Sequence, residues 1–83
     1  MKYEIKFEKR AFQELNKLDE FIARRIFKDI KSLQDGFKSK DVKRLKGRDT
    51  YRLRVVNYRV LMEIDKNLIK IFKIGHRKNI YKK

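Results

Sequence analysis

Residues 51–81 read YRLRVVNYRVLMEIDKNLIKIFKIGHRKNIY, and this stretch determines the fold that the sequence predicts. Two runs rich in Val, Ile, Leu, Tyr and Phe, Tyr58–Asp65 and Leu68–His76, are separated by the dipeptide Lys66-Asn67. Asn tolerates the positive φ of a tight turn, so the pattern predicts a β-hairpin. We expect a third strand, Tyr51–Val56, to lead into it.

The alternation of these strands predicts two unlike faces, because successive side chains point to opposite sides of a sheet. One face is apolar and is formed by Tyr51, Leu53, Val55, Tyr58, Val60, Met62, Ile64, Phe72 and Ile74. The other collects the cations Arg52, Arg54, Arg59, Lys73 and, if the last strand continues, Arg77. Like charges this close repel one another unless an anion or an acidic partner lies among them. A solvated basic face is the alternative interpretation.

The N-terminal half predicts one strand followed by two helices. Lys2–Phe7 alternates as a strand does, and the apolar period becomes helical from about Glu8. Asp19 can cap a second helix, which ends near Asp35-Gly36. We therefore expect an α+β fold with the order β-α-α-β-β-β, in which a two-helix hairpin packs on one face of a mostly antiparallel four-stranded sheet. Residues 1–83 should form a single domain.

The charge of the chain favours an anionic partner. The 83 residues carry 25 Lys and Arg against 11 Asp and Glu, a net charge of +14. Residues 51–83 hold 10 basic and 2 acidic side chains, so the predicted sheet is the more basic part per residue. Such a field attracts phosphate backbones or acidic proteins without sequence specificity. No cysteine, signal peptide or membrane-spanning run occurs, and we expect a cytoplasmic protein without a membrane partner.

The segment between the helices and the strands is polar and strongly basic. Residues 37–50 read FKSKDVKRLKGRDT, with Val42 and Leu45 as expected apolar anchors. The segment is either a solvated connection or an arm that adds phosphate contacts beside the basic face.

Three sequences carry a family resemblance: VKRLKG at 42–47, YRLRVVNYRVLMEID at 51–65 and IKIFKIGHRKNIY at 69–81. With the chain length and the order of predicted elements, they resemble the RelE toxins of bacterial and archaeal toxin–antitoxin systems. The resemblance covers essentially the whole chain. It is most specific in Leu45–Gly47, Tyr51–Arg54, Tyr58–Arg59 and Gly75–Tyr81.

The resemblance implies a ribosome-dependent, metal-independent endoribonuclease that cuts messenger RNA in the ribosomal A site and so inhibits translation. It also implies a cognate RelB-like antitoxin as a partner, besides the ribosome and messenger RNA, and no cofactor. Carried over residue by residue, the expected catalytic set is Arg52, Arg54, Arg59, Arg77 and Tyr81. Further RNA contacts are expected from Lys43, Arg44, Lys46, Lys73 and Lys78.

One departure from the family concerns the general base. The best-known members carry lysines where this chain has Arg52 and Arg54. A crowded lysine can lose its proton near neutral pH, whereas a guanidinium stays charged. The resemblance therefore assigns phosphate binding to these positions more firmly than proton removal.

Two other polar residues invite a catalytic interpretation. Histidine is a common acid–base residue in catalysis, but strand alternation places His76 opposite Arg77, which favours a structural role. Glu63 shares the face of Arg59 and could act as a base, although an ion pair that limits repulsion is the more economical interpretation. No spacing of carboxylates and histidine predicts a metal site.

Two alternative functions fit the same sequence. A ParE-type relative would inhibit DNA gyrase with this fold, and a non-enzymatic module would bind RNA or the ribosome through its charge alone. For a toxin, an antitoxin segment with acidic character is expected on exposed Leu61, Ile69 and Ile71, or on an outer apolar edge of the helix hairpin.

Overall fold

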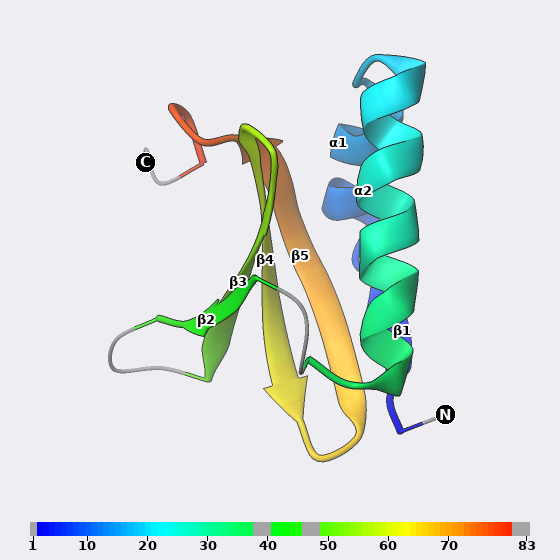
Figure 1. The fold of residues 1–83 in the computed structure, drawn as a ribbon, viewed down its shortest axis with the longest axis vertical. Coiled ribbons are helices and arrows are strands. Elements are labelled where there is room, and N and C mark those ends of the chain that lie inside the picture. The colour runs from blue at the N-terminus through cyan, green and yellow to red at the C-terminus, as the bar shows by residue number, and fades with distance from the viewer. Residues whose placement is uncertain (1, 38–40, 46–48, 81–83) are drawn as a thin grey trace.

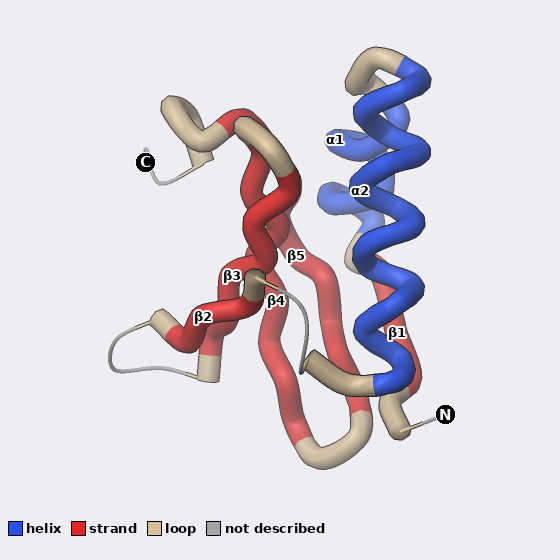
Figure 2. The backbone as a smooth tube through the Cα atoms, viewed as in Figure 1, coloured by secondary structure: helices blue, strands red, loops and turns tan. Residues whose placement is uncertain are grey.

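The computed structural model describes residues 2–37, 41–45 and 49–80. Within these residues the elements are, in chain order, β1 (Glu4–Phe7), α1 (Lys9–Asn16), α2 (Glu20–Ser32), the 3-10 turn η1 (Leu33–Asp35), β2 (Val42–Arg44), β3 (Thr50–Val55), β4 (Tyr58–Asp65) and β5 (Leu68–His76). Both helices lie to one side of the sheet (Figures 1 and 2). The α+β class and the helix hairpin are as the sequence predicts.

The strands form one sheet in the order β1-β5-β4-β3-β2. The pair β1 and β5 is parallel, and the other three pairs are antiparallel. The sheet has one strand more than the four predicted, because the short strand Val42–Arg44 pairs with β3 inside the segment expected to be a connection or arm. The polar composition of that segment concealed a strand of only three residues.

The sequence provides a side-chain cap at the start of α2 and a glycine after the 3-10 turn that follows it. The Phe21 N–H donates to Asp19 Oδ1 at 2.9 Å, so Asp19 satisfies an open donor in the first turn of α2. Beyond η1, Gly36 has a φ of 114°, which side chains rarely adopt. The positive φ therefore explains why glycine ends this helical region.

The core lies between the helices and one sheet face, with Ala11, Leu15, Ile26, Ile30, Leu33, Leu53, Val55, Val60, Met62, Ile69, Ile71 and Ile74 buried together. Tyr51, Tyr58 and Ile64 are partly buried against this cluster, so the predicted faces of β3 and β4 are confirmed.

The pairing of β1 with β5 ends at Ile71, so the edge of β5 beyond this residue has no neighbouring strand on that side. A side chain of α1 provides a hydrogen-bond acceptor there. The Ile74 N–H donates to Glu14 Oε1 at 2.9 Å.

The predicted faces of β5 are partly wrong, because a register shift interrupts its pairing with β4. Leu61 pairs with Lys73 but Met62 pairs with Ile71, so Phe72 is an extra residue in the strand. Odd-numbered residues of β5 therefore point to one face of the sheet before Phe72 and to the opposite face after it.

The three residues that we expected to form an exposed apolar surface for an antitoxin are all buried. Ile69 and Ile71 turn into the core, where both are 0% exposed. Leu61, the third residue of that expected surface, is also buried. An antitoxin therefore has no exposed apolar row to bind at these three positions.

The hairpin turns place positive φ on residues other than the expected Asn67. Lys66 has a φ of 54° in the β4–β5 turn, and Val56 has a φ of 55° in the β3–β4 turn. The β4–β5 turn is tight, as predicted, and in both turns the left-handed residue comes first. None of the helices in the described part of the chain is long and apolar enough to cross a membrane.

Candidate functional site

Three arginines lie on the sheet face away from the helices, and we call this surface the arginine face. Arg52 and Arg54 come from β3, and Arg59 comes from β4. Arg54 and Arg59 are directly opposite each other in the β3–β4 register. They belong to this face because the residues that alternate with them, Leu53 and Val60, are buried in the core.

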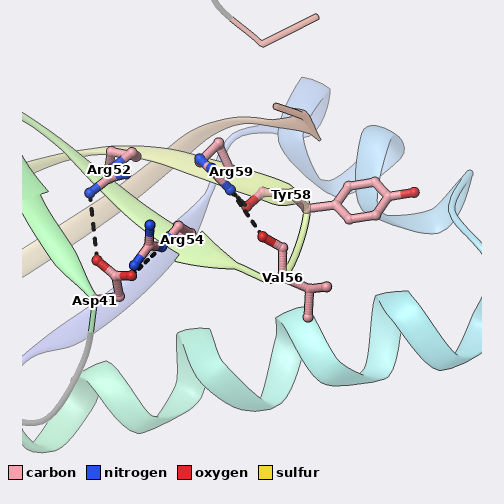
Figure 3. Close-up of polar contacts among 6 residues, drawn as sticks. All are labelled: Asp41, Arg52, Arg54, Val56, Tyr58 and Arg59. Carbon is pink, nitrogen blue, oxygen red and sulfur yellow. Dashed lines mark hydrogen bonds and ion pairs between the residues drawn. The ribbon is translucent and has the colours of Figure 1, made fainter. Parts of the chain in front are cut away.

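Asp41 is the carboxylate that limits repulsion on the arginine face. Its Oδ1 lies 3.5 Å from Arg52 Nη2, and its Oδ2 is paired with Arg54 Nε. The Arg54 N–H also donates to the Asp41 carbonyl oxygen at 3.0 Å. Figure 3 shows the two guanidinium groups reaching this one carboxylate from neighbouring positions on β3. Sequence reasoning missed Asp41, since its position depends on the pairing of β2 with β3.

Arg52 is more buried than its neighbours and is incompletely hydrogen bonded. Its side chain is 16% exposed, against 54% for Arg54. Its cross-strand neighbour is Leu61, which is itself buried. Among the described residues, Arg52 Nε is the buried side-chain polar atom that has no hydrogen-bond partner. A buried charged donor without an acceptor is costly, so Asp41 satisfies the Arg52 guanidinium only in part.

Arg59 folds back on the turn that precedes it. Its Nη1 donates to the Tyr58 carbonyl at 2.9 Å and to the Val56 carbonyl at 3.2 Å. Figure 3 shows Arg59 directed at these carbonyls while the Tyr58 ring points away from the guanidinium groups. Two backbone acceptors therefore hold the Arg59 guanidinium at the end of the arginine face.

The C-terminal turn begins beside the β3–β4 turn, which also holds Arg59. β5 ends at His76, so Arg77 lies in a turn and its predicted strand face does not apply. The Arg77 N–H donates to the Asn57 carbonyl at 2.8 Å, and the side chain is exposed. The three acceptor carbonyls belong to consecutive residues, 56–58. The backbone of Arg77 and the guanidinium of Arg59 are therefore bonded to the same short segment. Tyr81 lies outside the described residues.

Ile80 anchors the C-terminal turn on the sheet. The Asn79 and Ile80 N–H groups donate to the His76 carbonyl at 2.9 and 3.0 Å. The Ile80 side chain is 2% exposed, and its Cδ1 lies 3.3 Å from the position that a Cβ on Gly75 would take. Gly75 is the cross-strand neighbour of Arg59, so glycine leaves room for Ile80 beside it. The signal that could have predicted this anchor is an isolated apolar residue in the basic sequence HRKNIY.

His76 is held in a structural position. It is the cross-strand neighbour of Tyr58, and the two rings meet edge to face with centroids 5.4 Å apart. Its Nδ1 accepts a hydrogen bond from the Lys78 N–H at 3.1 Å. The ring therefore packs against an aromatic residue of the core side and does not join the arginines.

The other predicted RNA-binding residues are spread over the molecule. Lys43 is the cross-strand neighbour of Arg52, and Lys73 is the neighbour of Leu61, so these two extend the arginine face across the sheet. Arg44 lies on the opposite side of β2 and pairs with Asp49 at 3.2 Å. Lys78 is exposed in the C-terminal turn. Lys46 lies outside the described residues.

Glu63 lies on the same strand as Arg59 but toward its other end. Its cross-strand neighbours are Thr50 and Lys70, whereas Arg59 is opposite Arg54. The Glu63 carboxylate makes no ion pair with another described residue. The ion pair expected of Glu63 is therefore not found in the described part of the chain, and Asp41 has that role instead.

Comparison with known proteins places these observations in a family context. The model of the family described as the ParE toxin of type II toxin–antitoxin systems, parDE, matches residues 5–81. The chain is similar to one in the RelB–RelE antitoxin–toxin complex from Methanococcus jannaschii, with 31% identity, 92% of this chain and 94% of that chain covered, and a TM-score of 0.78. No curated protein sequence matches the chain.

Two further solved structures share the fold. The archaeal RelE–RelB complex from Pyrococcus horikoshii contains a chain with 29% identity and a TM-score of 0.77, with 95% of this chain and 99% of that chain covered. The intact RelBE toxin–antitoxin complex from E. coli gives 23% identity and a TM-score of 0.74, with 89% of this chain and 95% of that chain covered. The E. coli match concerns the fold alone.

Proposed function

The chain belongs to the ParE toxin family of type II toxin–antitoxin systems, and we propose that it acts as a ribosome-dependent endoribonuclease that cuts messenger RNA in the A site. The observation that carries this proposal is the arginine face. Arg54 and Arg59 are cross-strand neighbours, and Arg52 shares a carboxylate with Arg54. Three guanidinium groups gathered on one sheet face provide a site with the charge and the forked donors that a phosphodiester requires.

The proposed reaction is attack of a ribose 2′-hydroxyl on the adjacent phosphate. It requires removal of the hydroxyl proton, stabilisation of the negative charge on the phosphorane, and protonation of the leaving 5′-oxygen. Arg52, Arg54 and Arg59 are suited to the second requirement because they are permanently charged, forked donors. The ribosome would position the strained message and so contribute through orientation.

We propose that Arg77 and Tyr81 complete the site. The backbone of Arg77 is bonded to the β3–β4 turn, which also holds Arg59. Tyr81 directly follows Ile80, whose side chain is buried against the sheet beside Gly75. We propose that Arg77 binds the scissile phosphate and that Tyr81 orients the nucleotide by stacking or hydrogen bonding.

A cognate antitoxin is the second proposed partner, in line with the RelB–RelE complexes among the similar structures. We propose that its segment docks between α1 and α2, where Phe12 and Phe27 are 49% and 42% exposed. A surface cavity of about 280 Å³ is lined there by Phe12, Leu15, Asn16, Ala23, Arg24 and Phe27. Lys31 Nζ lies 5.9 Å from the Phe27 ring centroid, so the apolar groove has basic residues beside it. An acidic, amphipathic segment fits this combination.

Replacing Phe27 tests the docking site. Phe27→Ser should weaken binding of the co-expressed antitoxin by about tenfold or more, because the groove loses an exposed aromatic anchor. Lys28→Ser is the control on the same helix, with an exposed side chain outside the groove. Calorimetric titration measures both affinities. Equal affinity of Phe27→Ser and the unmodified protein would place the antitoxin elsewhere.

Inhibition of DNA gyrase is the second candidate function, because the matching family model is that of the ParE toxin. The arginine face does not distinguish the two candidates by itself, since a basic surface also attracts acidic protein. A binding module without catalysis is the third candidate.

Messenger RNA mapping separates the three candidates. The protein is induced in a translation-active extract, and messenger ends are mapped by primer extension with and without an inhibitor that empties the ribosomes. We expect in-frame cuts on translated messages that disappear when ribosomes are empty. Intact messages with translation blocked would indicate a binding module, and intact messages with arrested replication would indicate gyrase.

A further inference from the structure

The carboxylate of Asp41 occupies the place on the arginine face that an anionic ligand would take. One of its oxygens faces Arg52 Nη2 at 3.5 Å, and the other is paired with Arg54 Nε. Carboxylate and phosphate offer guanidinium groups similar charged oxygen acceptors. The free protein therefore has an internal anion among the residues proposed to bind RNA phosphate.

This internal anion satisfies the arginines only in part. The contact to Arg52 is long, and Arg52 Nε has no hydrogen-bond partner. The Asp41 side chain is 40% exposed, and ion pairs at such positions are weak because water and salt screen them. A phosphate that brings more acceptor oxygens can replace the carboxylate at Arg52 Nη2 and Arg54 Nε, the two groups that Asp41 faces.

The backbone anchor of Asp41 is separate from its carboxylate. The Arg54 N–H donates to the Asp41 carbonyl oxygen, which joins the start of β2 to β3 independently of the side chain. Removing the negative charge should leave this backbone contact in place. The function of the carboxylate can therefore be tested without removing the anchor.

We propose that Asp41 is an internal competitor of RNA phosphate, which holds Arg52 and Arg54 in the free protein and is displaced when substrate binds. The proposal rests on the proposed function of the arginine face. RNA that is not held by a ribosome must displace the carboxylate to bind. The affinity of the protein for such RNA is therefore lowered. A message held by the ribosome is presented at high local concentration and overcomes the competition.

Binding of a short, uncleavable 2′-O-methyl RNA oligonucleotide tests the proposal by fluorescence anisotropy at fixed salt. Asp41→Asn should bind about three- to tenfold more tightly than the unmodified protein, in line with the loss of the two ion pairs that the partly exposed Asp41 carboxylate makes. The control is Glu63→Gln, which removes one negative charge from the same sheet face but breaks no ion pair among the described residues. It should change the affinity by less than about twofold.

A double variant tests how much of the effect of Asp41 depends on Arg54. In an Arg54→Ala background, the further change Asp41→Asn should give less than half of its original effect, because the closer of the two arginines that Asp41 pairs with is absent. Unchanged or weaker binding by Asp41→Asn, or equal tightening by Glu63→Gln, would overturn the proposal. The binding measurement does not depend on cleavage. If Asp41→Asn binds more tightly and a separate assay shows no ribosome-dependent cleavage, only the proposed ribonuclease function is contradicted.

Discussion

At the scale of single residues, the site depends on how each guanidinium is held. Arg54 is bound at its side chain and its backbone by Asp41, whereas Arg59 is held by two backbone carbonyls. Arg59 therefore keeps its position without a carboxylate beside it. Its other nitrogens can serve a ligand, since both of these bonds come from one nitrogen, Nη1.

Arg59→Ala should lower ribosome-dependent cleavage by about 10²- to 10³-fold, the usual cost of losing one donor to developing charge. The free energy of unfolding should fall by no more than about 1 kcal/mol, because the lost contacts are hydrogen bonds near the surface. Lys28→Ala on α2 is the control. Single-turnover cleavage and urea denaturation measure the two effects. Cleavage within about threefold of the unmodified protein would exclude Arg59 from the site.

At the scale of elements, alternation predicts the faces of β3 and β4 and fails where local geometry departs from a regular ladder. Arg52, Arg54 and Arg59 could be placed on one face from sequence alone. The extra residue Phe72 could not be foreseen, because a register shift leaves no composition signal, and it reversed the expected exposure of Ile69. The pairing of Asp41 likewise depends on a strand of three residues, β2, which polar composition concealed.

The C-terminal turn depends on Ile80. Ile80→Ala should release it, so the Asn79 and Ile80 amides, which donate to the His76 carbonyl, should exchange hydrogen at least about tenfold faster. Amides of the β4–β5 ladder should keep their rates. Ile80→Val is the milder control, because it removes one methylene group. Unchanged exchange at these two amides would show that the turn is held by other contacts.

The β3–β4 turn contains strain at Val56. A β-branched residue is unfavourable at its φ of 55°, and the side chain is also 56% exposed. Val56→Asn should raise the free energy of unfolding by about 1 kcal/mol, because Asn tolerates left-handed backbone. Lys66→Asn, at a φ of 54° in the other turn, should give a smaller gain. Urea denaturation tests both, and a loss of stability in Val56→Asn would contradict this account.

At the scale of the whole molecule, the two sheet faces separate stability from binding. The helices cover one face and form the core with it, while the C-terminal turn lies on the other side (Figure 1). The arginine face belongs to that other side, because its residues alternate with buried core residues. The net charge of +14 suits both proposed partners, since RNA and an acidic antitoxin segment are each attracted to it. An antitoxin that docks between α1 and α2 would lie on the helix side of the sheet, so it would reach the arginines only through a connected segment.

Cleavage of a defined message on purified ribosomes with an empty A site tests the central claim most directly. We expect one cut within the A-site codon by the unmodified protein, no cut on the same message without ribosomes, and loss of the cut in an Arg54→Ala, Arg59→Ala double variant. An intact message in the presence of the unmodified protein, together with inhibition of gyrase supercoiling in a parallel reaction, would contradict this claim.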